Sequence, residues 1–330
     1  MTVDNLPLIE LPIIDFGPYL DPSSTAEQRQ AVDHAIDKAC RHLGIFYLVN
    51  HGIPQELCDK MSVIARQFFS LPFEEKRKHK VGGEVRGYWF TTNAEDLSNI
   101  PCEGIAFHPP VNQCSNGVAP DIDPASPEAR LPTTHDALGG QHSWPNDHFR
   151  AHAEELLSHI VPLKVRLLDS ISNCLGLSDA SRKLVQNTVP HIAFNSYSSL
   201  TKAQMEEGVS NLVEHTDPGT ITILTQDVDV VALQVKDSDG KWCGVKPIPG
   251  SFVVNVGSSL NRFTGNQYVD TLHRVIHCSE KSRISMALLA DPVFDVVIEP
   301  LPECPFKTDL AKFVPKTFGA FYLDQVPEDH

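Results

Sequence analysis

His215-Thr216-Asp217 is the stretch that decides how this chain is interpreted, together with His273 and Arg283-Ile284-Ser285 further along. His273 follows Asp217 by 56 residues, and Arg283 follows His273 by ten. Two imidazoles and one carboxylate are the ligand set of mononuclear non-haem iron(II) centres, which leave three octahedral positions open for substrate and oxygen. The pattern therefore predicts an oxygen-activating enzyme with one metal ion.

The predicted metal site needs its three ligands on β-strands. Side chains at positions i and i+2 of a strand point to the same face, so His215 and Asp217 can reach one ion from one edge of a barrel. His273 lies in the β-prone run 268–275, which would place it on a facing strand. One histidine among fifteen is weak evidence. The combination with Arg283 and Ser285 is far more specific than any of its parts.

A zinc hydrolase is an alternative, since zinc also binds two histidines and a carboxylate and activates a water as the nucleophile. That alternative leaves Arg283 unexplained. A buried guanidinium at this position makes sense if it forms a bidentate pair with a carboxylate, with the Ser285 hydroxyl as a further donor. Considered alone, Arg283 would be interpreted as an ordinary surface ion pair.

The pattern of apolar residues changes from helical to strand-like along the chain. The first half predicts a strand at 11–16, a capping box formed by Ser24 and Glu27 before a helix, a strand at 45–49 and a helix ending near Pro72. Long loops are expected between Asn93 and Asn146, followed by a long helix through 156–175. Strands are expected at 192–197, 220–226, 231–235, 252–256 and 284–290. This order predicts a β-barrel or double-sheet core with helices packed outside it.

Composition narrows the partners and the compartment. The net charge of -15 argues against a nucleic-acid partner, because a phosphate-binding surface needs clustered Lys and Arg. The start of the chain lacks a basic segment followed by an apolar run, and no stretch approaches the roughly 18 apolar residues of a membrane helix. We therefore expect a cytoplasmic protein with no membrane partner. The eight scattered cysteines are expected to be reduced, and no repeat or coiled coil argues against a monomer.

Over most of its length the sequence resembles the iron(II)/2-oxoglutarate-dependent dioxygenases, in the branch of isopenicillin N synthase and the plant-type oxygenases. The matching segments occur in the family's order, which is hard to obtain by chance. The resemblance implies a double-stranded β-helix, or jelly roll, with an N-terminal helical region and flanking helices, mainly β with α. The segments that carry it are 11–16, 39–40, 44–47, 50–53, 68–72, 75–76, 87–88, 233–235, Trp242, 253–257 and 273–275.

Carried over by position, the resemblance implies that His215, Asp217 and His273 bind iron(II). It implies that Arg283, Ser285 and Tyr197 hold the distal carboxylate of 2-oxoglutarate and that His51 is structural. Asn195 either orients this cosubstrate or satisfies backbone groups. The chain departs from the family pattern at Asn255-Val256-Gly257-Ser258, at Thr264-Gly265-Asn266 and at Val231-Ala232. These departures touch no ligand and put only local turns and the pocket shape in question.

The resemblance also suggests a division of the chain and a substrate pocket. The division is an N-terminal region over 1–120, a loop and long helix over 121–187, the jelly-roll core over 188–300 and a tail over 301–330 that covers the site. Each aromatic of the expected pocket has core packing as its alternative. The expected lining comprises the segment from Tyr88 to Phe90, Phe107, His108, Phe194, Leu260, Phe263 and the tail segment from Phe318 to Tyr322.

The implied activity uses iron(II), 2-oxoglutarate and O2 to oxidise an unactivated C–H bond and releases succinate and CO2. We expect a small-molecule substrate from secondary metabolism and an outcome of hydroxylation, desaturation, ring closure or ring expansion. Two alternatives stay open at this point. One is an isopenicillin N synthase-like oxidase that uses no 2-oxoglutarate, and the other is a non-catalytic binding protein on the same scaffold.

Overall fold

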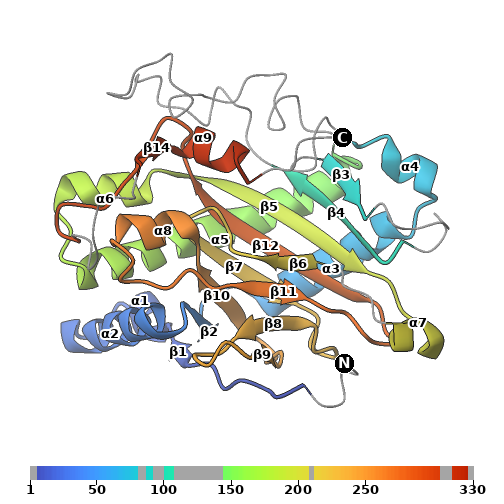
Figure 1. Cartoon of the computed structure of the whole chain (residues 1–330), viewed down its shortest axis with the longest axis horizontal. Coiled ribbons are helices and arrows are strands. Elements are labelled where there is room, and N and C mark those ends of the chain that lie inside the picture. Colours follow the sequence, from blue (N-terminus) through green and yellow to red (C-terminus); the bar gives the residue numbers. More distant parts are fainter. Residues whose placement is uncertain are drawn as a thin grey trace.

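A large sheet and a small sheet form the centre of the molecule (Figure 1). The computed structural model describes residues 6–80, 87–91, 100–107, 144–207, 212–304 and 314–325. The strands of the large sheet are β1 (Ile13–Asp15), β2 (Ile45–Val49), β3 (Gly87–Phe90), β4 (Cys102–Phe107), β5 (Thr188–Tyr197), β7 (Ile221–Gln226), β10 (Phe252–Val256) and β12 (Arg283–Pro292). Their spatial order is β1-β2-β10-β7-β12-β5-β4-β3, and all neighbours are antiparallel except β1 and β2.

The small sheet has its strands in the order β6-β11-β8-β9. Its members are β6 (Leu212–His215), β8 (Leu233–Lys236), β9 (Trp242–Gly244) and β11 (His273–Val275). A separate pair of short strands, β13 (Val297–Ile298) and β14 (Lys316–Thr317), lies near the C-terminal helix. Since the chain alternates between the two sheets after residue 188, the second half forms the predicted double-sheet core.

Helices cover the outer face of the large sheet, with α3 and α5 behind the strands in Figure 1. Their apolar stripes pack on side chains such as Ile192 and Phe194 of β5, and this packing forms the main hydrophobic core. The helices are α1 (Gly17–Leu20), α2 (Ala26–His42), α3 (Gln55–Phe69), α4 (Phe73–Arg77), α5 (Asp147–Cys174), α6 (Asp179–Gln186), α7 (Lys202–Glu207), α8 (Ser258–Phe263) and α9 (Phe318–Leu323).

The predicted helices form, and the structure differs from the sequence expectations at one helix cap and one strand. The capping box of α2 is made by Thr25 and Gln28, one residue later than the expected Ser24 and Glu27. Both pairs have the required spacing, so the pattern alone did not select between them. The second difference is β4, a fully buried strand inside the segment expected to be loop. β4 is buried on both faces and therefore shows no alternation of apolar and polar residues.

Among the described residues, no helix is long and apolar enough to cross a membrane. The longest helix, α5, carries charged side chains along its length and contains Pro162. Its buried face packs against α2, α3 and α6, so it belongs to the core of the fold.

Candidate active site

The candidate site is a cavity of about 310 Å³ between the inner faces of the two sheets. Strand register across the large sheet arranges its floor in rows of side chains. One row contains Tyr197 and Arg283, and the next contains Asn195 and Ser285. The following rows are Ala106, Ala193, Ala287 and Leu224, then His191, Leu289, Thr222 and Asn255. All of these residues line the cavity.

His215, Asp217 and His273 come together at the side of this cavity formed by the small sheet. One ligand atom from each lies within 4.8 Å of the others. The Nε2 atoms of His215 and His273 are each 3.8 Å from Oδ1 of Asp217. The two imidazole rings are 4.3 Å apart between centroids. Within the described residues, this is the only cluster of three such groups that could hold a metal ion.

One detail of the predicted ligand geometry was wrong, and the expectation that His273 lies on a separate strand agrees with the structure. His215 is the last residue of β6, and Asp217 lies beyond the strand, so the two do not share a strand face. His273 is on β11, which pairs directly with β6 so that His273 lies opposite His215 in the same sheet. The two histidines are therefore cross-strand neighbours, and the chain brings Asp217 to them by turning toward the large sheet.

Backbone carbonyl groups orient both imidazoles. Nδ1 of His215 lies 2.8 Å from the Val213 carbonyl oxygen, and Nδ1 of His273 lies 2.9 Å from that of Thr271. Each contact places the proton on Nδ1, which leaves the lone pair of Nε2 available for a metal. Burial lowers the pKa of His273, so its imidazole is in the neutral form that binds metals.

The two oxygens of Asp217 have different surroundings. Oδ2 accepts hydrogen bonds from Thr222 Oγ1 at 2.5 Å and from Asn255 Nδ2 at 2.8 Å, whereas Oδ1 faces the histidines. Burial favours the neutral acid, but His273, His215 and these two hydrogen bonds hold the pKa of Asp217 below its ordinary value. The donor set is two imidazoles and one carboxylate, which fits iron(II).

Arg283 lies at the other end of the cavity with only 1% of its surface exposed. Nη2 donates to Gln226 Oε1 at 2.6 Å, and the guanidinium carbon lies 4.8 Å from the centre of the Tyr197 ring. Nε and Nη1 have no hydrogen-bond partner among the described residues. A buried guanidinium with unused donors fits a ligand carboxylate, because a bidentate pair would satisfy both nitrogens.

Tyr197, Asn195 and Ser285 surround this guanidinium as the sequence predicts. Ser285 follows Arg283 on the same face of β12, and β5 places Tyr197 opposite Arg283 and Asn195 opposite Ser285. Burial raises the pKa of Tyr197 well above its usual range, so its hydroxyl stays a hydrogen-bond donor at neutral pH. The group as a whole fits the distal carboxylate of 2-oxoglutarate.

Of the expected aromatic lining of the pocket, only Trp89 and Tyr322 line the cavity, and the other expected aromatics were wrong. Neither Leu260 nor six of the expected aromatics line the cavity; these residues belong to the main hydrophobic core, except Phe90, which packs against that core. Their strand neighbours line it instead: Trp89 rather than Tyr88 or Phe90, Ala106 rather than Phe107, and Ala193 rather than Phe194. Alternate side chains of a strand face opposite sides, and the larger apolar ones here face the helices. The six aromatics that lie away from the cavity are Tyr88, Phe90, Phe107, Phe194, Phe263 and Phe318.

Three further expectations concern the tail segment, His108 and His51. Tyr322 of α9 lines the cavity, as expected for the tail segment, whereas Phe318 at the start of the same helix is buried in the core. His108 lies outside the described residues. His51 stacks on Phe252 with ring centroids 4.0 Å apart, and its Nδ1 accepts from the Ile53 amide, which agrees with a packing role.

Sequence reasoning missed four residues that contact the site: Thr222, Asn255, Gln226 and His191. Alternation along β7 and β10 would have placed Thr222, Gln226 and Asn255 on one face as polar residues in largely apolar strands. His191 lines the cavity and its Nδ1 lies 3.3 Å from Asp291 Oδ2, a contact between residues 100 apart in the chain. No pattern in the sequence points to that pair.

Comparison with known proteins agrees with this geometry. Residues 11–121 match the family model described as non-haem dioxygenase in morphine synthesis N-terminal, and residues 189–292 match that of the 2OG-Fe(II) oxygenase superfamily. A homoarginine-6-hydroxylase of Arabidopsis thaliana is 32% identical over 307 residues, covering 88% of this chain and 80% of the relative. The chain belongs to the 2OG-Fe(II) oxygenase superfamily.

Other relatives and solved structures support the same assignment. The flavonol synthase/flavanone 3-hydroxylase of Matthiola incana is 28% identical, covering 94% of this chain and 97% of the relative. The structure of JOX2 in complex with 2OG, Fe and JA is 26% identical with a TM-score of 0.73, covering 98% of this chain and 87% of that one. The structure of a dioxygenase for auxin oxidation in rice, 24% identical with a TM-score of 0.68 over 95% of this chain and 94% of that one, shows the shared fold.

The predicted family and the jelly-roll fold with its N-terminal helices are thus confirmed. The protein is a non-haem dioxygenase that uses iron(II) and 2-oxoglutarate. This result sets aside the zinc hydrolase, the oxidase that uses no 2-oxoglutarate and the non-catalytic binding protein.

Proposed function

We propose that this dioxygenase oxidises an unactivated C–H bond of a small, largely apolar molecule held between its two sheets. The observation that carries the proposal is that one cavity contains both the His215, Asp217 and His273 cluster and the buried guanidinium of Arg283. A row of three alanines separates the row of Ser285 from the row of Thr222 and Asn255, and their small side chains leave room above the floor.

In this proposal the protein's residues hold and orient the reactants. His215, Asp217 and His273 would hold iron(II) through two Nε2 atoms and Oδ1, with Thr222 and Asn255 fixing the carboxylate. Arg283, Ser285, Tyr197 and Asn195 would hold the distal carboxylate of 2-oxoglutarate. When bound, iron(II) and 2-oxoglutarate supply the oxidising power, because reduction of O2 is coupled to decarboxylation of 2-oxoglutarate to succinate and CO2.

The residues around the cavity favour an uncharged substrate. Apolar side chains from both sheets supply much of the lining, including Leu224, Leu233, Val275 and Leu289. His191 and Tyr322 add one imidazole and one phenol, which suit the hydroxyl or carbonyl groups of a phenolic compound. Asp217 is the only acidic side chain of the described lining, so a guanidinium substrate would find no second carboxylate there.

The relatives are named for different molecules, and these molecules are the compounds to test as substrates. Homoarginine-6-hydroxylases, a jasmonate-induced oxygenase and a flavanone 3-hydroxylase are each about 30% identical to this chain. We expect a flavanone to stimulate succinate release at least fivefold above the rate without substrate, because its neutral rings match the apolar lining. Mass spectrometry of the product formed under labelled O2 would then report hydroxylation directly.

Stimulation by homoarginine, with none by flavanones or other neutral phenolics, would contradict the proposed substrate class. Jasmonate would test an intermediate case, an apolar molecule with one carboxylate. The choice among hydroxylation, desaturation and ring chemistry, the role in secondary metabolism, the division of the chain into regions, the cytoplasmic location and the monomeric state all stay predictions from the sequence.

A further inference from the structure

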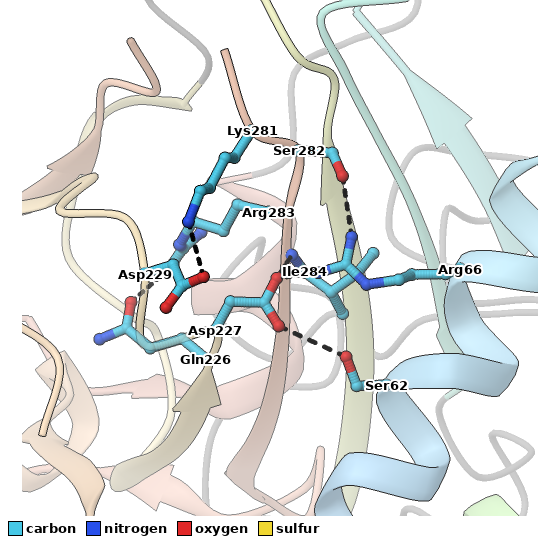
Figure 2. A network of polar contacts seen from close by, with 9 residues as sticks. All are labelled: Ser62, Arg66, Gln226, Asp227, Asp229, Lys281, Ser282, Arg283 and Ile284. Carbon is cyan, nitrogen blue, oxygen red and sulfur yellow. Dashed lines mark hydrogen bonds and ion pairs between the residues drawn. The ribbon is translucent and has the colours of Figure 1, made fainter. Parts of the chain in front are cut away.

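Gln226 and Asp227 are consecutive residues at the end of β7, and both contact the first residues of β12 (Figure 2). Gln226 Oε1 accepts from Nη2 of Arg283 at 2.6 Å. Asp227 Oδ2 accepts from the backbone N–H of Ile284 at 2.6 Å, and the Asp227 N–H donates to the Ile284 carbonyl at 3.0 Å. One side chain thus contacts the guanidinium, while the next holds the backbone beside it.

Strand geometry explains why the two contacts are on opposite faces. Gln226 lies directly opposite Ser285 in the sheet, so it shares the face of Ser285 and Arg283. Asp227 turns to the other face, where Arg66 and Ser62 of α3 contact its carboxylate. Arg66 also donates to Ser282 Oγ at 2.9 Å. The helix α3 therefore contacts Ser282, the residue before Arg283, directly, and Ile284, the residue after it, through Asp227.

The charges around Arg283 are arranged so that its own charge is not neutralised by the described residues. Asp227 is paired with Arg66, and Asp229 is paired with Lys281 at 2.9 Å. Gln226 is a neutral amide, and its Nε2 has no hydrogen-bond partner among the described residues. Burial and the Arg283 cation lower the pKa of the adjacent His277 to about 4, so this imidazole is neutral at pH 7.

We propose that Gln226 and Asp227 are positioning residues for the cosubstrate. Gln226 aims the Arg283 guanidinium without neutralising it, and Asp227, anchored by Arg66, fixes the β12 backbone from the opposite face. This inference rests on the proposed role of Arg283 in binding the distal carboxylate of 2-oxoglutarate. It adds that the amide at position 226 selects for an anionic ligand, because a carboxylate there would take the place of the ligand's own carboxylate.

The sharpest test compares Gln226→Glu with Gln226→Leu. The readout is the dissociation constant of 2-oxoglutarate, measured without oxygen from the visible charge-transfer absorption of the iron(II) protein. Glu keeps the shape and the acceptor but neutralises Arg283, so we expect at least a tenfold weaker affinity. Leu removes the acceptor and leaves the charge, so we expect a loss of about three- to fivefold. Thermal unfolding of the metal-free protein should show Gln226→Glu to be as stable as wild type or more stable.

A structural role alone predicts the reverse order, since Glu accepts the Arg283 hydrogen bond better than Leu. Affinity in Gln226→Glu within twofold of wild type would overturn the proposal. Arg283→Ala separates this failure from failure of the proposed site: if that variant also binds 2-oxoglutarate like wild type, the carboxylate assignment of Arg283 is wrong as well.

The second contact has its own matched control. Arg66→Ala removes the ion pair that anchors Asp227, and Lys281→Ala removes the exposed pair with Asp229 on the same turn. We expect Arg66→Ala to raise the KM for 2-oxoglutarate three- to tenfold with kcat unchanged at saturation, Arg66→Lys to restore it, and Lys281→Ala to stay within twofold of wild type. Equal effects of Arg66→Ala and Lys281→Ala, or a fall in kcat alone, would contradict a positioning role.

Discussion

At the scale of single residues, the different contacts of the two carboxylate oxygens of Asp217 determine the geometry of the candidate metal centre. Oδ2 is satisfied by Thr222 and Asn255, so Oδ1 is left to face the imidazoles of His215 and His273. A carboxylate held in this way loses little conformational freedom when a metal binds. Removing a hydrogen-bond partner that supports a metal ligand typically lowers metal affinity by roughly 10- to 100-fold.

Replacing Asn255 tests this support. Asn255→Ala should weaken iron(II) binding about 10- to 100-fold, because Asp217 keeps only one of its two donors. Asn255→Asp should weaken it further, since a second buried carboxylate would repel Asp217 at 2.8 Å. Anaerobic titration with iron(II) measures both variants.

Ser251→Ala is a suitable control, because Ser251 precedes the same strand and its hydroxyl donates to the Ile248 carbonyl, away from the metal ligands. It should bind iron(II) like wild type. An Asn255→Ala protein that also keeps wild-type affinity would show that the amide does not support Asp217.

At the scale of secondary-structure elements, the alternation of β5 separates the cavity from the core. Ala193 lines the cavity, and the next residue, Phe194, is fully buried against the helices with its ring 5.1 Å from that of Phe149. Neighbouring positions therefore have different roles, one setting the space for ligands and the other contributing to the stability of the fold.

Two substitutions separate these roles. Ala193→Phe should lower substrate-stimulated succinate release at least tenfold with little change in unfolding free energy, because it fills the cavity. Phe194→Ala should lower the free energy of unfolding by about 3–5 kcal/mol, the usual loss for a buried phenylalanine. Urea unfolding and a succinate assay on both proteins measure this, and swapped phenotypes would mean that the faces of β5 have been assigned the wrong way round.

The same alternation shows what the sequence could and could not predict. The long helices α2, α3 and α5 were predictable, because they carry apolar stripes at helical spacing, and so were the main strands after Pro190, which are bounded by turn residues. The strand β4 was not. The phase of alternation was not, since Ile192-Ala193-Phe194 and Gly104-Ile105-Ala106-Phe107 are apolar on both faces of their strands. We expected the larger side chains to line the cavity, but they pack against the helices instead.

The candidate site was predictable for a different reason. His215, Asp217, His273, Arg283 and Ser285 are chemically specific and occur at spacings that the family also shows. Their supporting contacts were not predictable, because Thr222, Asn255 and Gln226 reach the site only through strand pairing. The pairing of His273 with His215 in one sheet depends on the order β6-β11-β8-β9, which no local pattern specifies.

At the scale of the whole molecule, Lys164 links the long helix α5 to the start of β5. Its ammonium group is buried and donates to the hydroxyl and carbonyl of Thr188 at 2.9 and 3.3 Å. Burial lowers the pKa of Lys164 from 10.5 to about 8. Between these values the unfolded chain binds a proton that the folded protein does not, so stability rises with pH across this window.

Comparison with Lys164→Met isolates this effect. Relative to the variant, wild type should gain roughly 3 kcal/mol of unfolding free energy as pH rises from about 8 to above 10, and the difference should be constant below pH 7. Urea unfolding at several pH values measures it, with Lys60→Met on the exposed face of α3 as the control. A stability difference between wild type and Lys164→Met that does not change with pH would contradict a lowered pKa of Lys164 in the folded protein.

The central claim is that one cavity holds iron(II) through Asp217 and its two histidines and holds 2-oxoglutarate through Arg283. The most direct measurement is the visible charge-transfer absorption that forms when 2-oxoglutarate is added without oxygen to the iron(II) protein. We predict a saturable band in wild type, half-saturation at least tenfold higher in Arg283→Ala, and no band in Asp217→Ala at one equivalent of iron. A band of wild-type strength and affinity in both variants would contradict the account.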